Sequence, residues 1–198
     1  MKKILLLGDS IRMGYDDFVK EMAAGKYEVY YFESDNGRFA SYTLWQANQL
    51  LRIYGPFDYI HFNNGYWDMN REAPMNTPLS PIPEYLSFLK RIIDLGRENG
   101  AEVIFATTVP IYEDGASLDN TGTYASINYK NSWVKEYNEA ALALMKEENV
   151  PVNDLYTLML KGERYYKCQD SLHLTLEGYK VCAKAVIDTI DNLEKNKK

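Results

Sequence analysis

The chain has 198 residues, a length typical of one domain, and we predict a single domain over residues 1–198. Hydrophobic residues make up 46% of it and charged residues 25%, which favours a soluble protein with a sizeable core. The formal charge of -6 would repel phosphate backbones, so the composition argues against a nucleic-acid partner.

The apolar runs and the two cysteines argue against several further classes. The run near the start, Ile4–Leu7, is shorter than the roughly 7–15 apolar residues of a secretory signal. No run approaches the roughly 18 residues of a membrane span. We therefore predict a cytoplasmic location and no membrane partner. Cys168 and Cys182 have no metal-ligand spacing, and we predict neither a metal site nor a cofactor. The sequence leaves the oligomeric state open.

Short apolar segments alternate with longer amphipathic ones along the chain. Strand character marks Lys3–Leu7, Tyr27–Phe32, Phe57–Phe62, Ala101–Thr107 and Val150–Asp154. Apolar residues at helical spacing mark Tyr42–Ile53, Glu84–Glu98, Asn128–Glu148 and Leu176–Leu193. The last helix has Thr175 as its predicted N-cap. This alternation predicts an α/β fold, a three-layer α/β/α sandwich around a five-stranded parallel sheet.

Polar residues follow the predicted strands, at the sheet edge where open parallel sheets bind ligands. Gly8-Asp9-Ser10 follows the first strand, and Asp170-Ser171-Leu172-His173 precedes the last helix. A serine hydroxyl becomes a good nucleophile only when a base accepts its proton, and histidine suits that task near neutral pH. The histidine in turn needs an acceptor that holds its tautomer. We predict Ser10 as nucleophile, His173 as base and Asp170 as the orienting acid.

Some of these polar residues also have plausible structural roles. His61 lies inside the third predicted strand, so its ring is expected to pack against a helix layer. Ser10 could serve as a helix N-cap, a common role for serine after a strand. Asp9 is expected to brace the loop. Cys168 could pair with His173 as a thiol nucleophile, but no strand-to-helix setting lowers its pKa.

The two polar segments together resemble the first and last blocks of the SGNH (GDSL-like) hydrolase superfamily, over roughly residues 3 to 190. The segments NGRFASYTL and HFNNGYWD are similar to a bacterial branch whose third block reads NNG-x-W/H-D. The resemblance implies a flavodoxin-like SGNH hydrolase fold. It also implies ester hydrolysis through a Ser-His-Asp triad and an acyl-enzyme.

The resemblance further implies an oxyanion hole with three donors. One is the backbone N–H of Ser10. The second is the N–H of a glycine in the second block, where this chain has Ser41, with Gly37 as the alternative. The third is an asparagine side chain at the position of Trp67. Asn64 is predicted to replace it, and Asn63 and the Trp67 indole are the remaining candidates.

The substrate site is predicted to include Asp9, Tyr66 and Trp67, beside a rim of aromatic residues that also holds Tyr112, Tyr124 and Tyr129. Such a rim could hold a sugar ring or an acyl chain, or it could pack a lid. The predicted function is a serine ester hydrolase for small acyl esters, with acetylated carbohydrates as candidates. A catalytically weak glycan-binding protein is the alternative. A phosphate-binding flavodoxin-like module is disfavoured because the chain has no Gly-rich phosphate loop.

Overall fold

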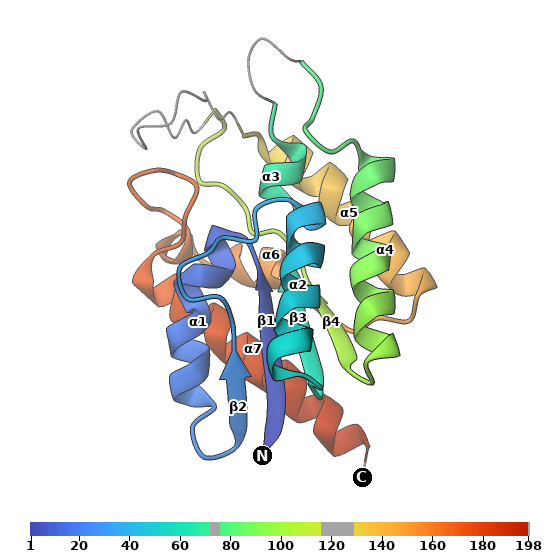
Figure 1. Cartoon of the computed structure of the whole chain (residues 1–198). Helices are drawn as coiled ribbons and strands as arrows, with labels where there is room; N and C mark the ends of the chain where they lie inside the picture. Colours follow the sequence, from blue (N-terminus) through green and yellow to red (C-terminus); the bar gives the residue numbers. More distant parts are fainter. Residues whose placement is uncertain (72–75, 116–128, 198) are drawn as a thin grey trace.

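The structure is a computed structural model that describes residues 1–71, 76–115 and 129–197. Its centre is a five-stranded sheet with the strand order β2-β1-β3-β4-β5, in which every pairing is parallel (Figure 1). The strands are β1 (Lys2–Gly8), β2 (Tyr27–Tyr30), β3 (Tyr59–Asn63), β4 (Glu102–Ala106) and β5 (Val152–Asn153). The predicted α/β fold with five parallel strands is confirmed.

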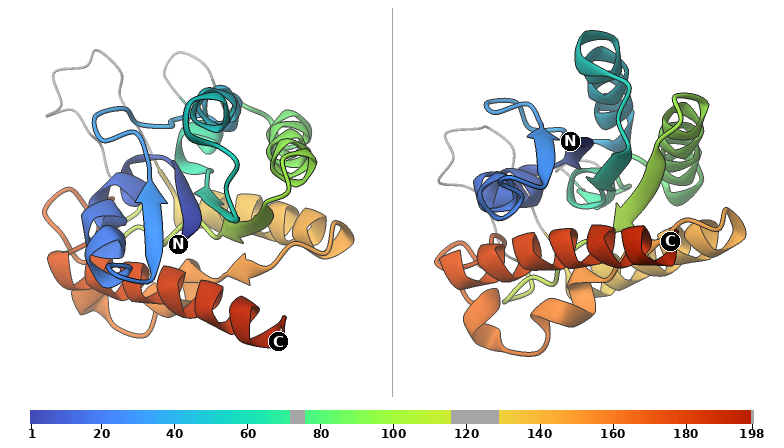
Figure 2. Two further views of the ribbon diagram at one scale, coloured as in Figure 1. Left: turned by 60° about the horizontal axis from the view of Figure 1, so that its bottom comes forward. Right: turned by 90° about the horizontal axis from the view of Figure 1, so that it is seen from below.

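Five long helices cover the two faces of this sheet. They are α1 (Ser10–Met22), α2 (Ala40–Tyr54), α4 (Ile82–Glu98), α5 (Asn131–Glu147) and α7 (Leu176–Asn196). Helices α1 and α7 pack together on one face, whereas α2 packs against α4 on the other and α4 also contacts α5 (Figure 2). The result is the predicted three-layer arrangement.

Among the described residues, four helical elements were not predicted from the sequence. They are the long helix α1 and three short elements, α3 (Tyr66–Met69), α6 (Leu155–Met159) and the 3-10 turn η2 (Glu163–Tyr165). The three short elements span at most five residues, which is too few for an apolar repeat to show in a sequence.

The register of the sheet places the polar segments at one edge. Strand β1 is buried from Ile4 to Gly8, as its continuous apolar run predicts for a central parallel strand. Gly8 is paired with Asn63, the last residue of β3. The residues that follow these two strands, Asp9 and Asn64, therefore emerge side by side at the carboxyl edge of the sheet.

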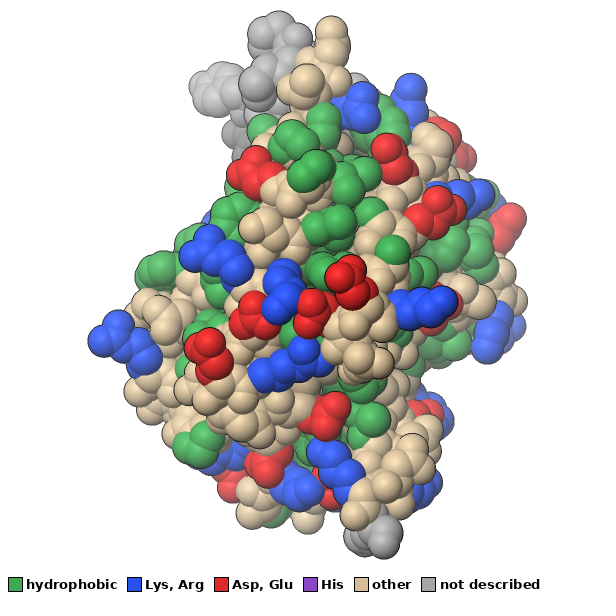
Figure 3. Space-filling view, turned by 90° about the vertical axis from the view of Figure 1, so that its right-hand side faces the viewer, with side chains coloured by type: hydrophobic (Ala, Val, Ile, Leu, Met, Phe, Trp, Pro, Cys, Tyr) green, Lys and Arg blue, Asp and Glu red, His purple; other side chains and the backbone are tan. Residues whose placement is uncertain are grey.

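Positive and negative side chains are interspersed on the face of the molecule that carries α4 (Figure 3). Lys90 and Arg97 of α4 form ion pairs with Asp94 and Glu148. In the three described stretches, no helix is both long and apolar enough to cross a membrane.

Candidate active site

Ser10 lies at the first position of α1, directly after the N-cap residue of that helix. The cap is Asp9, whose carboxylate accepts a hydrogen bond of 3.0 Å from the N–H of Ile11. The N-cap interpretation of Ser10 is therefore wrong, because Asp9 fills that position. The Ser10 hydroxyl is half-buried at the positive end of α1, where a helix dipole favours negative charge.

The structure brings Ser10, His173 and Asp170 into one line of contacts. Nε2 of His173 lies 2.8 Å from Oγ of Ser10, and Nδ1 of the same ring lies 2.5 Å from Oδ2 of Asp170. The side chains of His173 and Asp170 are 30% and 36% exposed, so a small molecule can approach them. This order of hydroxyl, imidazole and carboxylate is the one that proton transfer from a serine requires.

Asp170 is held by more than the imidazole. Its Oδ1 accepts hydrogen bonds from the N–H groups of Leu172 and His173, at 3.0 and 2.9 Å. Partial burial by itself would raise the pKa of Asp170. Hydrogen bonds from the Cys168 thiol, the His173 ring and the backbone outweigh it and hold the pKa well below its usual range. Asp170 is therefore a carboxylate at neutral pH, as an orienting acid must be.

Cys168 is part of this cluster, but the hydrogen bonds of its sulfur are with the Asp170 carboxylate and the His173 carbonyl and not with the imidazole that would activate a thiol nucleophile. Its Sγ lies 3.0 Å from Oδ1 of Asp170 and 2.6 Å from the carbonyl oxygen of His173. Burial, followed by the bond to Asp170, raises the pKa of the thiol to about 11. It is thus a hydrogen-bond donor. The sequence signal for this contact was its position two residues before Asp170, within reach of one tight turn.

The buried side chain of Asp9 supports the site and cannot contact a substrate. Its side chain is fully buried and accepts a second hydrogen bond, of 2.9 Å, from the amide of Asn63. Burial raises its pKa above the usual range for aspartate, although both hydrogen bonds lower it. The prediction that Asp9 contacts substrate is therefore corrected, because a fully buried carboxylate cannot reach a ligand. The expected bracing role fits these contacts.

Asn64 does not fit the donor role that we predicted. Its side chain is fully buried, and its amide donates to the carbonyl of Arg38 at 3.1 Å and to Oγ1 of Thr43 at 2.9 Å. These two bonds use both hydrogens of the amide. The structure thus ties Asn64 to α2 and to the loop before it, and the prediction that it completes the oxyanion hole is corrected. The backbone carbonyl of Asn64 accepts hydrogen bonds from the hydroxyls of Tyr85 and Thr108.

Three backbone N–H groups near the start of α2 differ in whether they are free to bind an oxyanion. The N–H of Gly37 donates to the carbonyl of Gly8 at 2.8 Å, so it is already engaged. The N–H of Ala40 is bonded to the carboxylate of Asp68. Ser41 is the next residue in this first turn of α2, where helix N–H groups have no intrahelical acceptor. Its backbone N–H therefore stays the second-block candidate.

The aromatic residues of the predicted rim differ in their burial. Tyr66 is buried, donates to the carbonyl of Val109 at 2.6 Å and packs against the buried Tyr129. Tyr66 is therefore corrected from a substrate contact to a core residue. Trp67 is half-buried with its ring edge against Phe39, and Tyr112 is half-buried as well. The remaining rim residue, Tyr124, lies outside the described residues.

The second histidine is separated from the reacting groups. His61 is fully buried in β3, with Nε2 3.1 Å from the amide nitrogen of Asn153 and its ring edge-on to Tyr15 of α1. Burial lowers its pKa to about 3, so the ring is neutral at physiological pH. It is packed against a helix, as its place in the strand predicted.

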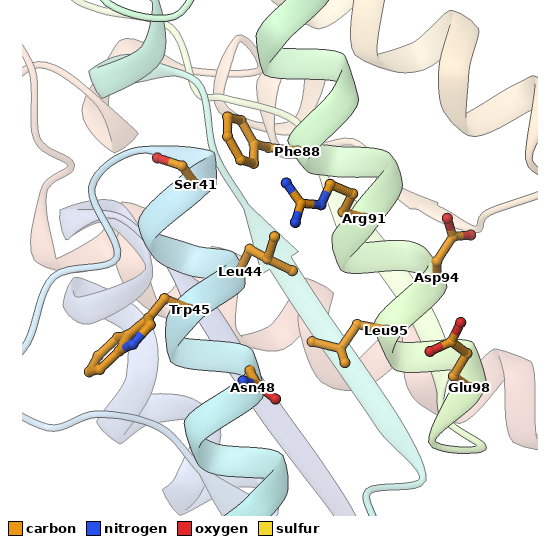
Figure 4. Close-up of a pocket in the computed structure, with 9 residues that line it drawn as sticks. All are labelled: Ser41, Leu44, Trp45, Asn48, Phe88, Arg91, Asp94, Leu95 and Glu98. Atoms are coloured by element: carbon orange, nitrogen blue, oxygen red, sulfur yellow. The ribbon is translucent and has the colours of Figure 1, made fainter.

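An open cavity of about 550 Å³ lies between α2 and α4, and Ser10 is not among the residues that line it (Figure 4). Leu44 and Leu95 face each other across it, and Arg91 extends from α4 toward α2. Ser41 stands at one end of this cavity and is the only candidate site residue among those that line it. Across the described parts of the chain, no three His, Cys, Asp or Glu side chains are grouped to hold a metal ion.

Comparisons with known proteins show which proteins the chain is similar to. The chain is 26% identical over 121 residues to the GDSL esterase/lipase WDL1 of Oryza sativa subsp. japonica, which covers 59% of this chain and 46% of the rice protein. The alignment thus spans about half the length of that relative. No protein-family model matches the chain.

Solved structures extend the likeness to nearly all of the chain. The lipase/acylhydrolase of Enterococcus faecalis is 23% identical with a TM-score of 0.74, and the match covers 97% of this chain and 96% of the other. The psychrotrophic esterase EstA of Pseudoalteromonas sp. is 14% identical with a TM-score of 0.71, covering 98% and 100%. The predicted resemblance to the SGNH/GDSL hydrolases is therefore confirmed at the level of the superfamily, and this chain has their fold.

Proposed function

We propose that this chain, as one domain over residues 1–198, is a serine ester hydrolase with the triad Ser10, His173 and Asp170. One observation carries the proposal: a single imidazole lies 2.8 Å from the Ser10 hydroxyl on one side and 2.5 Å from the Asp170 carboxylate on the other. The names of the rice and Enterococcus proteins, an esterase/lipase and a lipase/acylhydrolase, support the same reaction type.

In the proposed mechanism, Oγ of Ser10 attacks the ester carbonyl while Nε2 of His173 accepts the hydroxyl proton. The tetrahedral intermediate then collapses, and the alcohol leaves with the proton that His173 returns to it. Water, activated by the same ring, attacks the acyl-enzyme and releases the acid. Asp170 holds Nδ1–H of the ring throughout and stabilises the imidazolium that forms in each half-reaction.

The oxyanion in this proposal is held by backbone groups. The N–H of Ser10 and that of Ser41 belong to the first turns of α1 and α2, so both donors come from helix ends with positive potential. Because the Asn64 amide is engaged elsewhere, the Trp67 indole is the remaining side-chain candidate. Such a hole does not depend on the asparagine that the family places in its third block.

Small acyl esters are the proposed substrates, including acetyl groups on carbohydrates. The side chains of His173 and Asp170 are about one-third exposed, which allows a bulky alcohol such as a sugar to remain outside while its acyl group enters. A protein that only held a glycan would need no hydroxyl, imidazole and carboxylate in line. The geometry therefore favours hydrolysis over glycan binding alone.

A fluorophosphonate probe tests the reaction type directly, because it labels only a serine whose hydroxyl is activated. We expect one label on Ser10, together with hydrolysis in a panel of p-nitrophenyl esters and acetylated sugars of increasing size. The Ser10→Ala variant should neither label nor hydrolyse. A wild-type protein that binds acetylated sugars without labelling or turnover would instead be a glycan-binding protein.

A further inference from the structure

Cys168 makes contacts that the proposed mechanism has not used. Its sulfur lies 3.0 Å from Oδ1 of Asp170 and 2.6 Å from the carbonyl oxygen of His173, so it contacts two members of the triad at once. The other cysteine, Cys182, is fully buried in α7, with its sulfur 3.9 Å from that of Met159. Only one of the two thiols therefore touches the site.

The thiol is suited to donate and unsuited to attack. A thiol carries one hydrogen, and the charged carboxylate of Asp170 is a stronger acceptor than the neutral carbonyl of His173. Because burial and the bond to Asp170 raise the pKa of Cys168 to about 11, the hydrogen stays on the sulfur at neutral pH. Cys168 thus presents a permanent donor to the orienting acid.

The hydrogen bond from the Cys168 thiol goes to Oδ1 of Asp170, the carboxylate oxygen that does not contact the His173 ring. Oδ1 of Asp170 accepts from the thiol and from two backbone N–H groups, and Oδ2 is left for the imidazole Nδ1. Both backbone donors come from residues that follow Asp170 in its own turn. The thiol comes from the residue two positions before Asp170, so it closes the ring of donors and opposes rotation of the carboxylate.

We propose that Cys168 is a positioning residue, whose thiol fixes the Asp170 carboxylate so that Oδ2 faces Nδ1 of His173. This inference rests on the proposed function, since it concerns the same triad. Hydrogen bonds from neighbouring side chains hold a catalytic group in its productive orientation. Their loss lowers activity without removing any reacting atom.

The variants Cys168→Ala, Cys168→Ser and Cys182→Ala separate this role from a general effect of losing a thiol. Cys168→Ala should lower kcat about 10-fold, at the low end for a hydrogen bond to a charged group, with KM unchanged. Cys168→Ser keeps a donor and should restore most of kcat. Cys182→Ala is the matched control, because it removes a thiol that does not contact the triad, and it should leave kcat at the wild-type value.

A second measurement reads the carboxylate–imidazole contact without any substrate. The Nδ1 proton of His173, held between the ring and Asp170, gives a proton NMR signal far downfield. We expect Cys168→Ala to shift or broaden it, and Cys168→Ser to return it. Unchanged kcat and an unchanged signal in Cys168→Ala, or a serine variant as impaired as alanine, would overturn the inference. If the wild type neither labels nor hydrolyses esters, the proposed function fails, and the NMR comparison still decides the role of Cys168.

Discussion

Nε2 of His173 lies 2.8 Å from Oγ of Ser10, although 163 positions separate the two residues in the sequence. Ser10 begins α1 directly after the central strand β1, and His173 lies three residues before the start of α7. Because α1 and α7 pack against each other on one face of the sheet, their starting ends meet at its carboxyl edge. The contact between nucleophile and base thus depends on how closely these two helices pack.

The carboxylate of Asp170 is expected to matter nearly as much as the nucleophile. In Asp170→Asn, the amide can donate to Nδ1 and so favour the tautomer that cannot accept a proton at Nε2. We expect kcat to fall roughly 10⁴-fold, as in other triads with this change. Steady-state kinetics should show a loss close to that of Ser10→Ala, since triad members act as a unit. An Asp170→Asn variant with kcat near wild type would remove Asp170 from the triad.

Asn64 is expected to contribute to stability and not to the chemical step. Asn64→Ala removes the donors to the Arg38 carbonyl, which is partly buried, and to the buried Thr43 hydroxyl, which keeps only its bond to the carbonyl of Gly37. Each loss of this kind costs about 1–3 kcal/mol, so the melting temperature should fall by several degrees. With the fold intact, kcat should stay within about threefold of wild type, whereas loss of an oxyanion donor costs about 10²–10³-fold. A fall in kcat of that size with unchanged melting would restore the donor role.

The contrast between Asn64 and Asp170 shows what the sequence could predict. Asp170 and His173 stand three residues apart, so one turn determines their geometry, and the spacing was sufficient to predict their contact. The direction of the Asn64 side chain depends on Arg38 and Thr43, which lie 26 and 21 residues away. No local pattern reports such partners.

Burial is the other property that the sequence could not supply. Tyr66 follows a strand in a polar segment, which made it a candidate for the rim. The structure turns it inward because α3 begins at this residue, and a helix of four residues leaves no periodic signal. Strands were easier to predict, because continuous apolar runs such as Ile4–Leu7 fit only a buried central position in a parallel sheet.

His61 is expected to make the fold sensitive to acid without taking part in catalysis. Its pKa of about 3 in the folded state is below the ordinary value of 6.5, so the unfolded chain binds a proton more readily. The stabilisation is complete above pH 6.5 and is lost as the pH falls toward 3. Between pH 7 and pH 4, this single group should lower the free energy of unfolding by about 3 kcal/mol.

Urea denaturation of wild type and His61→Phe at several pH values measures that contribution. The phenylalanine ring fills a similar space and cannot be protonated. We expect the variant to be less stable than wild type at pH 7, because Asn153 loses its partner, and to lose less stability on acidification. Its ester hydrolysis at pH 7 should persist. A His61→Phe protein that folds but is inactive would contradict the assignment of His173 as the base.

The last prediction concerns the packing of α1 against α7, which sets the distance between Ser10 and His173. Gly14 lies one turn after Ser10, and a Cβ placed on it would come within 2.1 Å of Cε1 in the ring of Tyr179, in the first turn of α7. Glycine at this position therefore permits the two helices to approach. A larger residue must move either the ring or the helix.

Two opposing effects decide the result of Gly14→Ala. Alanine favours a helix interior by about 1 kcal/mol over glycine, whereas overpacking in a core costs about 1–3 kcal/mol. We expect the overpacking to prevail, with a lower melting temperature and a lower kcat, because α1 carries Ser10 away from the imidazole. The kinetics and melting of Gly14→Ala should be measured beside those of Gly14→Ala combined with Tyr179→Ala, with Tyr179→Ala alone as the matched control. Adding Gly14→Ala to the Tyr179→Ala protein should then cost little, since the ring it would strike is gone. If Gly14→Ala lowers kcat equally with and without the ring, the close approach of the two helices is not what positions Ser10.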